Sequence, residues 1–118
     1  MQSEAIIVER IMSFANQCGD PAPSALRYVR GTRGAFGSSS YNTETHRDEA
    51  ATSAILVEAT GQFTWRHSAP HRASPYTSGH AISLVIDELT GAVVSRSIRP
   101  EPLDLSSYGQ VNHPAVPK

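Results

Sequence analysis

The sequence predicts an α+β fold in which one N-terminal helix packs on a curled antiparallel sheet of four to five strands. Two observations support this: an apolar stripe with helical spacing near the start, and short runs of apolar and β-branched residues after residue 51. The chain has 118 residues, which suits one hydrophobic core. We therefore expect a single domain over residues 1–109, followed by a loose tail over residues 110–118.

The predicted helix covers residues 3–18. Its apolar side chains follow one another at steps of four, three and four, which places them on one side: Ile7, Ile11, Phe14 and Cys18. Ser3 can cap the first turn, and Glu4 suits the positive end of the helix dipole. Gly19, followed by Asp-Pro, ends the helix.

The remaining elements are strands. A stretch around Tyr28 fits either a short strand or a helical turn, and it leads into a Gly/Ser-rich loop. The later runs predict two successive hairpins. In the first, "TSAILVEA" and "QFTWRH" are joined by a turn or bulge at Thr60-Gly61. In the second, "HAISLVID" and "AVVSRSI" are joined by the turn "ELTG". Alternation in "QFTWRH" puts Phe63, Trp65 and His67 on one face.

Charge and composition exclude several classes of function. Nine of the ten basic residues are Arg, and the single Lys is Lys118, so no internal lysine can form a Schiff base or a phosphate-binding loop. The net charge of -1 gives no indication of a nucleic-acid partner. Cys18 is the only cysteine, which excludes an internal disulfide. With no signal peptide and no membrane-length apolar run, we expect a cytoplasmic protein without a membrane partner.

The stretch "FTWRHSAPHR" concentrates residues capable of chemistry. His67 and His71 are four residues apart, but Pro70 between them prevents one helical face, so we expect no metal site and no cofactor. His67, at a strand end, is a candidate proton carrier, against the alternative of a solvated histidine. Glu101 in the proline-rich C-terminal segment is a second candidate, against a solvated carboxylate.

Arginines and aromatic residues suggest a pocket that holds carboxylates. The candidates for substrate binding are Arg66 and Arg96 on the hairpins, together with Trp65, Tyr28 and Tyr76. Surface salt bridges are the alternative explanation for the arginines. Because one helix covers such a sheet incompletely, the other face must be solvated, hold a ligand or pair with a second subunit in a homodimer.

The turn "DELTGAV" carries a first resemblance. Asp87, Thr90, Gly91 and Val93 look like the D-x-x-T-G-x-V turn of PepSY-type domains and, more loosely, of cystatin-like folds. Those folds also pack one helix on an antiparallel sheet. The resemblance implies a non-catalytic binding module that sequesters a peptide or an enzyme. The Q-x-V-x-G hairpin of cystatins is absent from this sequence.

A second resemblance rests on overall likeness. Its length, its Arg and Ala/Pro bias and the opening "IVERIMSFANQCGDPAPSALRYVRGTRGAFG" are similar to the lysinoalanine-forming proteins of cinnamycin- and duramycin-type lanthipeptide pathways. The resemblance implies a dimeric cyclase whose partner is a modified precursor peptide. It would promote addition of a lysine amine to dehydroalanine, largely by positioning the peptide. His67 or Glu101 would assist proton movement, while arginines would hold the peptide's carboxylates.

Overall fold

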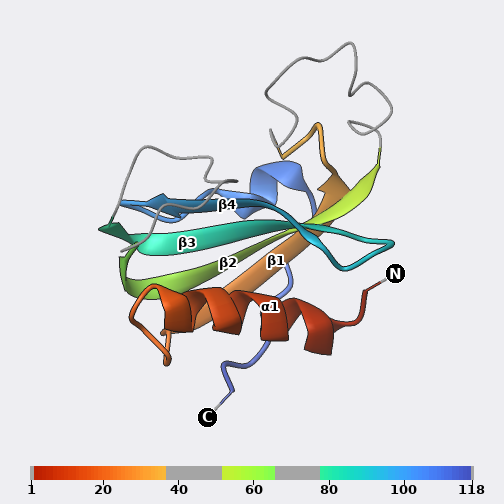
Figure 1. Cartoon of the computed structure of the whole chain (residues 1–118). Helices are drawn as coiled ribbons and strands as arrows, with labels where there is room; N and C mark the ends of the chain where they lie inside the picture. Colours follow the sequence, from red (N-terminus) through yellow and green to blue (C-terminus); the bar gives the residue numbers. More distant parts are fainter. Residues whose placement is uncertain (1, 37–51, 66–77, 118) are drawn as a thin grey trace.

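The computed structural model describes residues 2–36, 52–65 and 78–117 and confirms the α+β class (Figure 1). One helix packs against an antiparallel sheet of four strands in the order β1-β2-β3-β4. The elements are α1 (Glu4–Gln17), β1 (Ala25–Thr32), β2 (Ser53–Thr64), β3 (Ser78–Asp87), β4 (Val93–Arg99) and the short 3₁₀ helix η1 (Leu105–Tyr108). Arg66, His67 and Tyr76 lie outside the described residues.

Helix α1 begins and ends within a residue of its predicted limits. The Ser3 hydroxyl accepts a hydrogen bond from the amide of Ile6 at 3.3 Å, as expected of an N-cap. Ile7, Ile11 and Phe14 are buried against the sheet, and Cys18 at the C-cap is buried with them. No helix among residues 2–36, 52–65 and 78–117 is long and apolar enough to cross a membrane.

The first predicted hairpin does not form. Residues 53–64 make one continuous strand, β2, which pairs with β1 on one side and with β3 on the other. The Thr60-Gly61 segment is a bulge rather than a turn, because the pairing with β3 shifts between Thr60 and Phe63. The region around Tyr28, left open between strand and helical turn, is strand β1.

Gly61 shows why this bulge needs a glycine. A Cβ atom there would lie 2.4 Å from Oδ2 of Asp20, which accepts the amide of Gln62 at 3.0 Å. Asp20 in the loop after α1 therefore anchors the bulged strand, and the close approach leaves no room for a side chain.

The second predicted hairpin is correct. Strands β3 and β4 are joined through the "ELTG" turn, where Oδ1 of Asp87 accepts the amides of Leu89 at 2.8 Å and Thr90 at 3.0 Å. These hydrogen bonds lower the pKa of Asp87, with that from Thr90 contributing most. Gly91 has φ +74°, a left-handed conformation that closes the turn.

The two faces of the sheet are covered differently. On the helix-side face, α1 packs on an apolar cluster formed by strand residues Leu26, Tyr28, Ile55, Val57, Ala59, Phe63, Ile82, Leu84, Ile86 and Ile98. The opposite face, here the arm-side face, carries Val29, Ala54, Leu56 and Val85. Leu105 of η1 is fully buried against them. Figure 1 shows α1 and η1 on opposite sides of the sheet.

From the sequence, water, a ligand or a second subunit could cover this arm-side face, and the proline-rich C-terminal segment was expected to form an extended arm across the sheet or a neighbouring chain. In the structure the chain's own C-terminal arm, residues 100–117, crosses the sheet, with Leu103, Leu105 and Val111 packed on this face.

Part of the segment expected to be a loose tail, residues 110–118, contacts the sheet. Asn112 and Tyr28 exchange two backbone hydrogen bonds, of 2.8 and 2.9 Å, at the open edge of β1. Pro114 is buried, and Val116 contacts the helix-side cluster.

Candidate functional site

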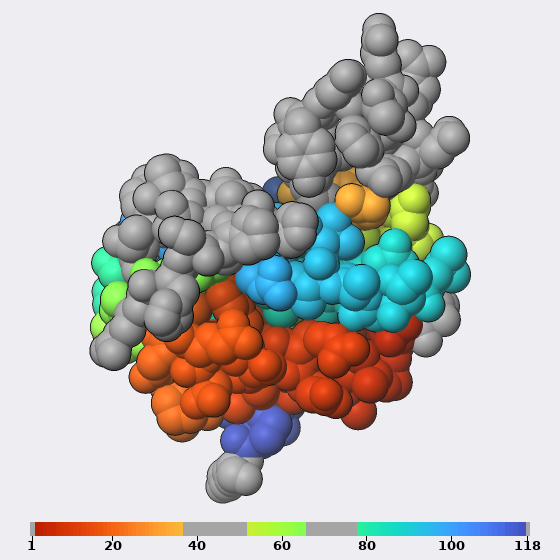
Figure 2. Space-filling model, viewed as in Figure 1, coloured from red at the N-terminus to blue at the C-terminus, as the bar shows by residue number. Residues whose placement is uncertain are grey.

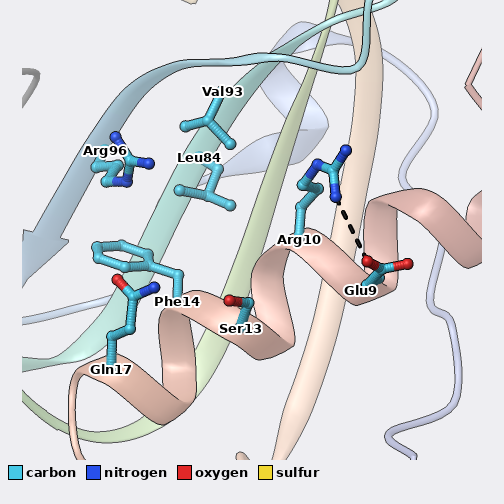
Figure 3. A pocket seen from close by; sticks show the side chains of 8 residues that line it. All are labelled: Glu9, Arg10, Ser13, Phe14, Gln17, Leu84, Val93 and Arg96. Atoms are coloured by element: carbon cyan, nitrogen blue, oxygen red, sulfur yellow. Dashed lines mark hydrogen bonds and ion pairs between the residues drawn. The ribbon is translucent and has the colours of Figure 1, made fainter.

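A groove lies between α1 and the edge strand β4 (Figure 3). Its volume is about 140 Å³. Helix α1 supplies Glu9, Arg10, Ser13, Phe14 and Gln17, and the sheet supplies Leu84, Val93 and Arg96. Figure 2 shows the helix in red to orange directly against the cyan to blue strands that form the other wall.

The helical repeat explains how α1 lines the groove. Arg10, Phe14 and Gln17 follow at steps of four and three, so their side chains leave the helix on one side. Phe14 is buried and forms part of the apolar floor, while Ser13 and Gln17 are exposed at the rim. The groove therefore combines an apolar floor with a polar rim.

Arg96 is the predicted site residue that the structure places in this groove. It pairs in register with Leu84, so its side chain leaves β4 on the helix-side face at the edge of the sheet. Its guanidinium makes no hydrogen bond or ion pair within the part of the chain that the structure describes. Arg96 is thus a half-buried guanidinium on the groove wall, and planar guanidinium groups are suited to binding carboxylates.

Arg10, the other guanidinium of the groove, has partners. Its Nε donates to the carbonyl of Gly91 at 3.1 Å, which ties α1 to the β3–β4 turn. Its Nη1 lies 3.5 Å from Oε1 of the exposed Glu9. In Figure 3, Arg10 and Glu9 lie toward one end of the groove, and Arg96 and Phe14 toward the other.

Trp65 is not among the residues that line the groove, but it contacts one of them. Its ring meets that of Phe14 edge-on, with centroids 5.0 Å apart, and it is half-buried. Trp65 therefore supports the aromatic part of the floor through Phe14. The predicted alternation is confirmed in that Phe63 and Trp65 both contact the helix-side cluster.

Tyr28 does not reach the groove, although it was predicted to bind substrate. It is buried under the start of α1, where its hydroxyl donates to Oε1 of Glu4 at 3.0 Å. Burial raises the pKa of Tyr28, and the Glu4 carboxylate raises it further. Arg30 lies over the ring of Tyr28, with its Cζ 5.6 Å from the centroid, so Glu4 and Arg30 both contact this side chain away from the groove.

Glu101 is also separate from the groove. It is exposed in the segment after β4, and it is not among the residues that line the groove. The other predicted members of the site, Arg66, His67 and Tyr76, fall outside the described residues, so their predicted roles stay predictions.

A row of polar side chains crosses the arm-side face. Neighbouring strands bring Arg27, Glu58, Ser83 and Ser97 into register, one residue from each strand. Glu58 has an exposed fraction of 1%, yet both carboxylate oxygens are bound: Oε1 by Arg27, and Oε2 by the amide of Leu103 at 2.7 Å. The hydroxyls of Ser83 and Ser97 hydrogen-bond to each other at 2.5 Å.

This polar row attaches the C-terminal arm. Arg27 donates a second hydrogen bond, from Nη2 to the carbonyl of Leu103 at 3.0 Å, so both backbone groups of Leu103 are bound. Our sequence interpretation missed Glu58. The available signal was a carboxylate inside the apolar run "AILVEA", because a charge in a buried strand requires a partner.

A second buried carboxylate, that of Glu88, lies in the turn between β3 and β4. Glu88 accepts a hydrogen bond from Arg30 on Oε1 and the amide of Gln2 on Oε2 at 2.9 Å. Arg30 also donates to the carbonyl of Gln2 at 3.0 Å. These bonds tie the start of α1 to the β3–β4 turn and leave no oxygen of Glu88 without a partner.

Cys18 is unsuited to nucleophilic chemistry. Burial raises the pKa of its thiol to about 11, so the thiol is protonated at neutral pH. No cluster of three or more His, Cys, Asp or Glu side chains is placed to hold a metal ion among the residues that are described.

Comparisons with known proteins assign no family. The chain matches no known family model, and no curated protein and no solved structure is similar enough to count as a match.

Proposed function

We propose that this domain holds a carboxylate-bearing peptide in the groove between α1 and β4. The observation that carries the proposal is Arg96, a guanidinium on the groove wall that lacks a counter-ion among the described residues. Walls that exclude part of the water strengthen its attraction for a carboxylate relative to bulk solvent. A planar guanidinium also offers two parallel donors, which match the two oxygens of a carboxylate.

The resemblance to lysinoalanine-forming proteins supplies a specific peptide and reaction for this proposal. The peptide would be a dehydrated, thioether-bridged lanthipeptide, and the domain would bring its lysine amine against its dehydroalanine. A bond forms between the lysine nitrogen and the dehydroalanine Cβ, while the π electrons move to Cα. The proton lost by nitrogen is returned to Cα, so the product is an isomer of the substrate.

Positioning is the contribution that a peptide-binding groove can make to this reaction. Holding two reacting groups in alignment supplies up to roughly 7 to 11 kcal/mol of the barrier in ideal cases. Arg96 would act by fixing the peptide and would not touch the reacting atoms. His67 and Glu101 remain the proposed proton carriers, and the homodimer remains a prediction that light scattering of the purified protein would measure.

The test is bridge formation in a dehydrated, thioether-bridged precursor, incubated with and without the protein. Because closure leaves the mass unchanged, chromatography with tandem mass spectrometry must separate the open and closed isomers. We expect faster closure with the protein, and slower closure with Arg96→Gln than with the matched variant Arg99→Gln. Arg99 lies on the same strand but on the arm-side face.

Two other outcomes have distinct meanings. If the precursor binds but its dehydroalanine stays open at the uncatalysed rate, the domain is the non-catalytic binding module implied by the PepSY-like turn. If the precursor neither binds nor closes, the peptide proposal is wrong.

A further inference from the structure

We infer that the α1–β4 groove accepts the C-terminal residue of a peptide, with its α-carboxylate at Arg96 and an aliphatic side chain on the apolar floor. This inference rests on the proposed function, since it specifies which part of a peptide enters the groove.

The size of the groove limits what can enter it. A cavity of roughly 150 Å³ in another protein holds one benzene molecule. At about 140 Å³, this groove admits a group of that size, which corresponds to one side chain and its carboxylate. The rest of a larger peptide must therefore lie outside, along the rim formed by Ser13 and Gln17.

The arrangement of chemistry inside the groove favours a terminal residue. The floor is apolar, made by Phe14, Leu84 and Val93, and Arg96 stands beside it. A C-terminal aliphatic residue carries its carboxylate and its apolar side chain on the same Cα, so both reach their partners together. An internal Asp or Glu supplies a carboxylate, but only one or two methylenes to cover the floor.

Arg10 lies at the other end of the groove, and two of its guanidinium nitrogens already have partners. Its Nε is bound to the carbonyl of Gly91, and its Nη1 lies near Glu9. Arg96 makes no such bonds among the residues described, so it is the guanidinium with donors to offer. Ser13 and Gln17 are one helical turn apart at the exposed rim, where they can hydrogen-bond the peptide backbone as it leaves.

The experiment uses four N-acetylated tripeptides and the full chain labelled with ¹⁵N. The peptides are Gly-Gly-Leu acid, Gly-Gly-Leu amide, Gly-Gly-Ala acid and Gly-Glu-Gly amide, titrated while the amide signals of the groove residues are followed. We expect the Leu acid to bind about tenfold more tightly than its amide, because the amide lacks the charge that Arg96 binds. We expect the Leu acid to bind about fivefold more tightly than the Ala acid, because each methylene that becomes buried raises the affinity by up to roughly fourfold.

The outcomes separate the inference from the function on which it rests. If Gly-Glu-Gly amide binds as tightly as the Leu acid, recognition of a terminal residue is wrong, although the groove still binds peptide carboxylates. If no carboxylate peptide binds better than the Leu amide, both the inference and the proposed function are wrong.

Matched variants locate the binding. Arg96→Gln should remove the preference for acid over amide, and Arg99→Gln, on the same strand but the other face, should keep it. Val93→Ala should reduce the preference for Leu over Ala, and Val94→Ala, which faces the arm-side cluster, should not. Unchanged thermal unfolding midpoints for the Arg variants would show that they remain folded. An acid preference that survives in Arg96→Gln would overturn the assignment.

Discussion

The two faces of the sheet are closed by different means. On the helix-side face, α1 contributes a stripe of fully buried side chains, including Ile7 and Ile11, to an apolar cluster. On the arm-side face, η1 has only four residues and buries Leu105. There the covering segment is also held at Leu103, whose carbonyl accepts a hydrogen bond from Arg27 and whose amide donates one to Glu58.

The difference shows what a short covering segment requires. A helix of fourteen residues satisfies its interior backbone hydrogen bonds itself and buries a long apolar stripe, to which the contacts of Arg10 with Gly91 and of Glu4 with Tyr28 add. A short arm buries less, and its backbone groups next to the sheet need partners that a helix would supply internally. The polar row on the arm-side face supplies those partners. In the groove on the helix-side face, Arg96 has no such partner among residues 2–36, 52–65 and 78–117, which is why we propose binding there.

The largest effect should come from truncating the apolar anchor on either face. Ile11→Ala and Leu105→Ala should each lower the free energy of unfolding by about 3 kcal/mol, because both side chains are fully buried. Urea denaturation measures the loss of unfolding free energy, and hydrogen exchange shows which backbone amides lose protection. We expect Leu105→Ala to reduce protection mainly over residues 103–112, and Ile11→Ala to reduce it throughout the sheet. Equal loss of protection everywhere in both variants would mean that the arm is not a separate unit.

The second-largest loss of stability should come from breaking the ion pair between Arg27 and Glu58, which lies under the arm. Arg27→Met leaves the buried Glu58 carboxylate without its cation and should cost about 3 kcal/mol of unfolding free energy. The double variant Arg27→Met/Glu58→Leu should recover part of that loss, because an apolar pair replaces an unpaired charge, while the amide and carbonyl of Leu103 lose their side-chain partners.

Arg96→Met provides the control for this variant. The same substitution on the helix-side face removes a guanidinium that has no partner among the described residues, so stability should stay within about 0.5 kcal/mol. Urea denaturation of all the variants is the measurement. A double variant no more stable than Arg27→Met would show that the two residues do not act as a pair.

A smaller loss of stability is expected from a substitution in the turn between β3 and β4. Asp87→Ala removes the acceptor for the amides of Leu89 and Thr90 and should cost about 1 kcal/mol at pH 7. The pKa of Asp87 is lower in the folded than in the unfolded chain, because the ionised carboxylate accepts these bonds. Its contribution is therefore complete above its unfolded pKa, near 4, and is lost as the pH falls through its folded pKa.

Urea denaturation at pH 7 and at successively lower pH down to 2 checks this prediction. The difference between native protein and Asp87→Ala should shrink as the pH falls. Glu101→Ala is the control, because Glu101 is exposed and makes no hydrogen bond among the described residues, so its effect should be near zero at every pH. A constant difference for Asp87→Ala would contradict the role of the charge.

Local sequence patterns were enough to predict those elements whose determining residues lie close together in the chain. The spacing of Ile7, Ile11 and Phe14 predicted α1 and its buried side, and "DELTG" predicted the β3–β4 turn, because helix periodicity and turn chemistry are properties of neighbouring residues. The "ATGQ" segment led to the wrong prediction of a first hairpin, because a glycine suits both a turn and a bulge. Pairing of β2 with both neighbours and the approach of Asp20 decided between them.

The sequence by itself determined the α+β class, the capped helix and the second hairpin, since apolar spacing and turn residues act over a few positions. The proline-rich C-terminus also suggested an arm across the sheet or a neighbouring chain, and tertiary structure decided that it crosses this chain's own sheet. Tertiary structure alone decided that Tyr28 lies buried beside Glu4 and that Glu58 binds Arg27 and Leu103. It also placed Arg96 opposite Phe14 across a groove. These contacts join residues dozens of positions apart, where strand register and chain crossing, not local preference, set which side chains meet.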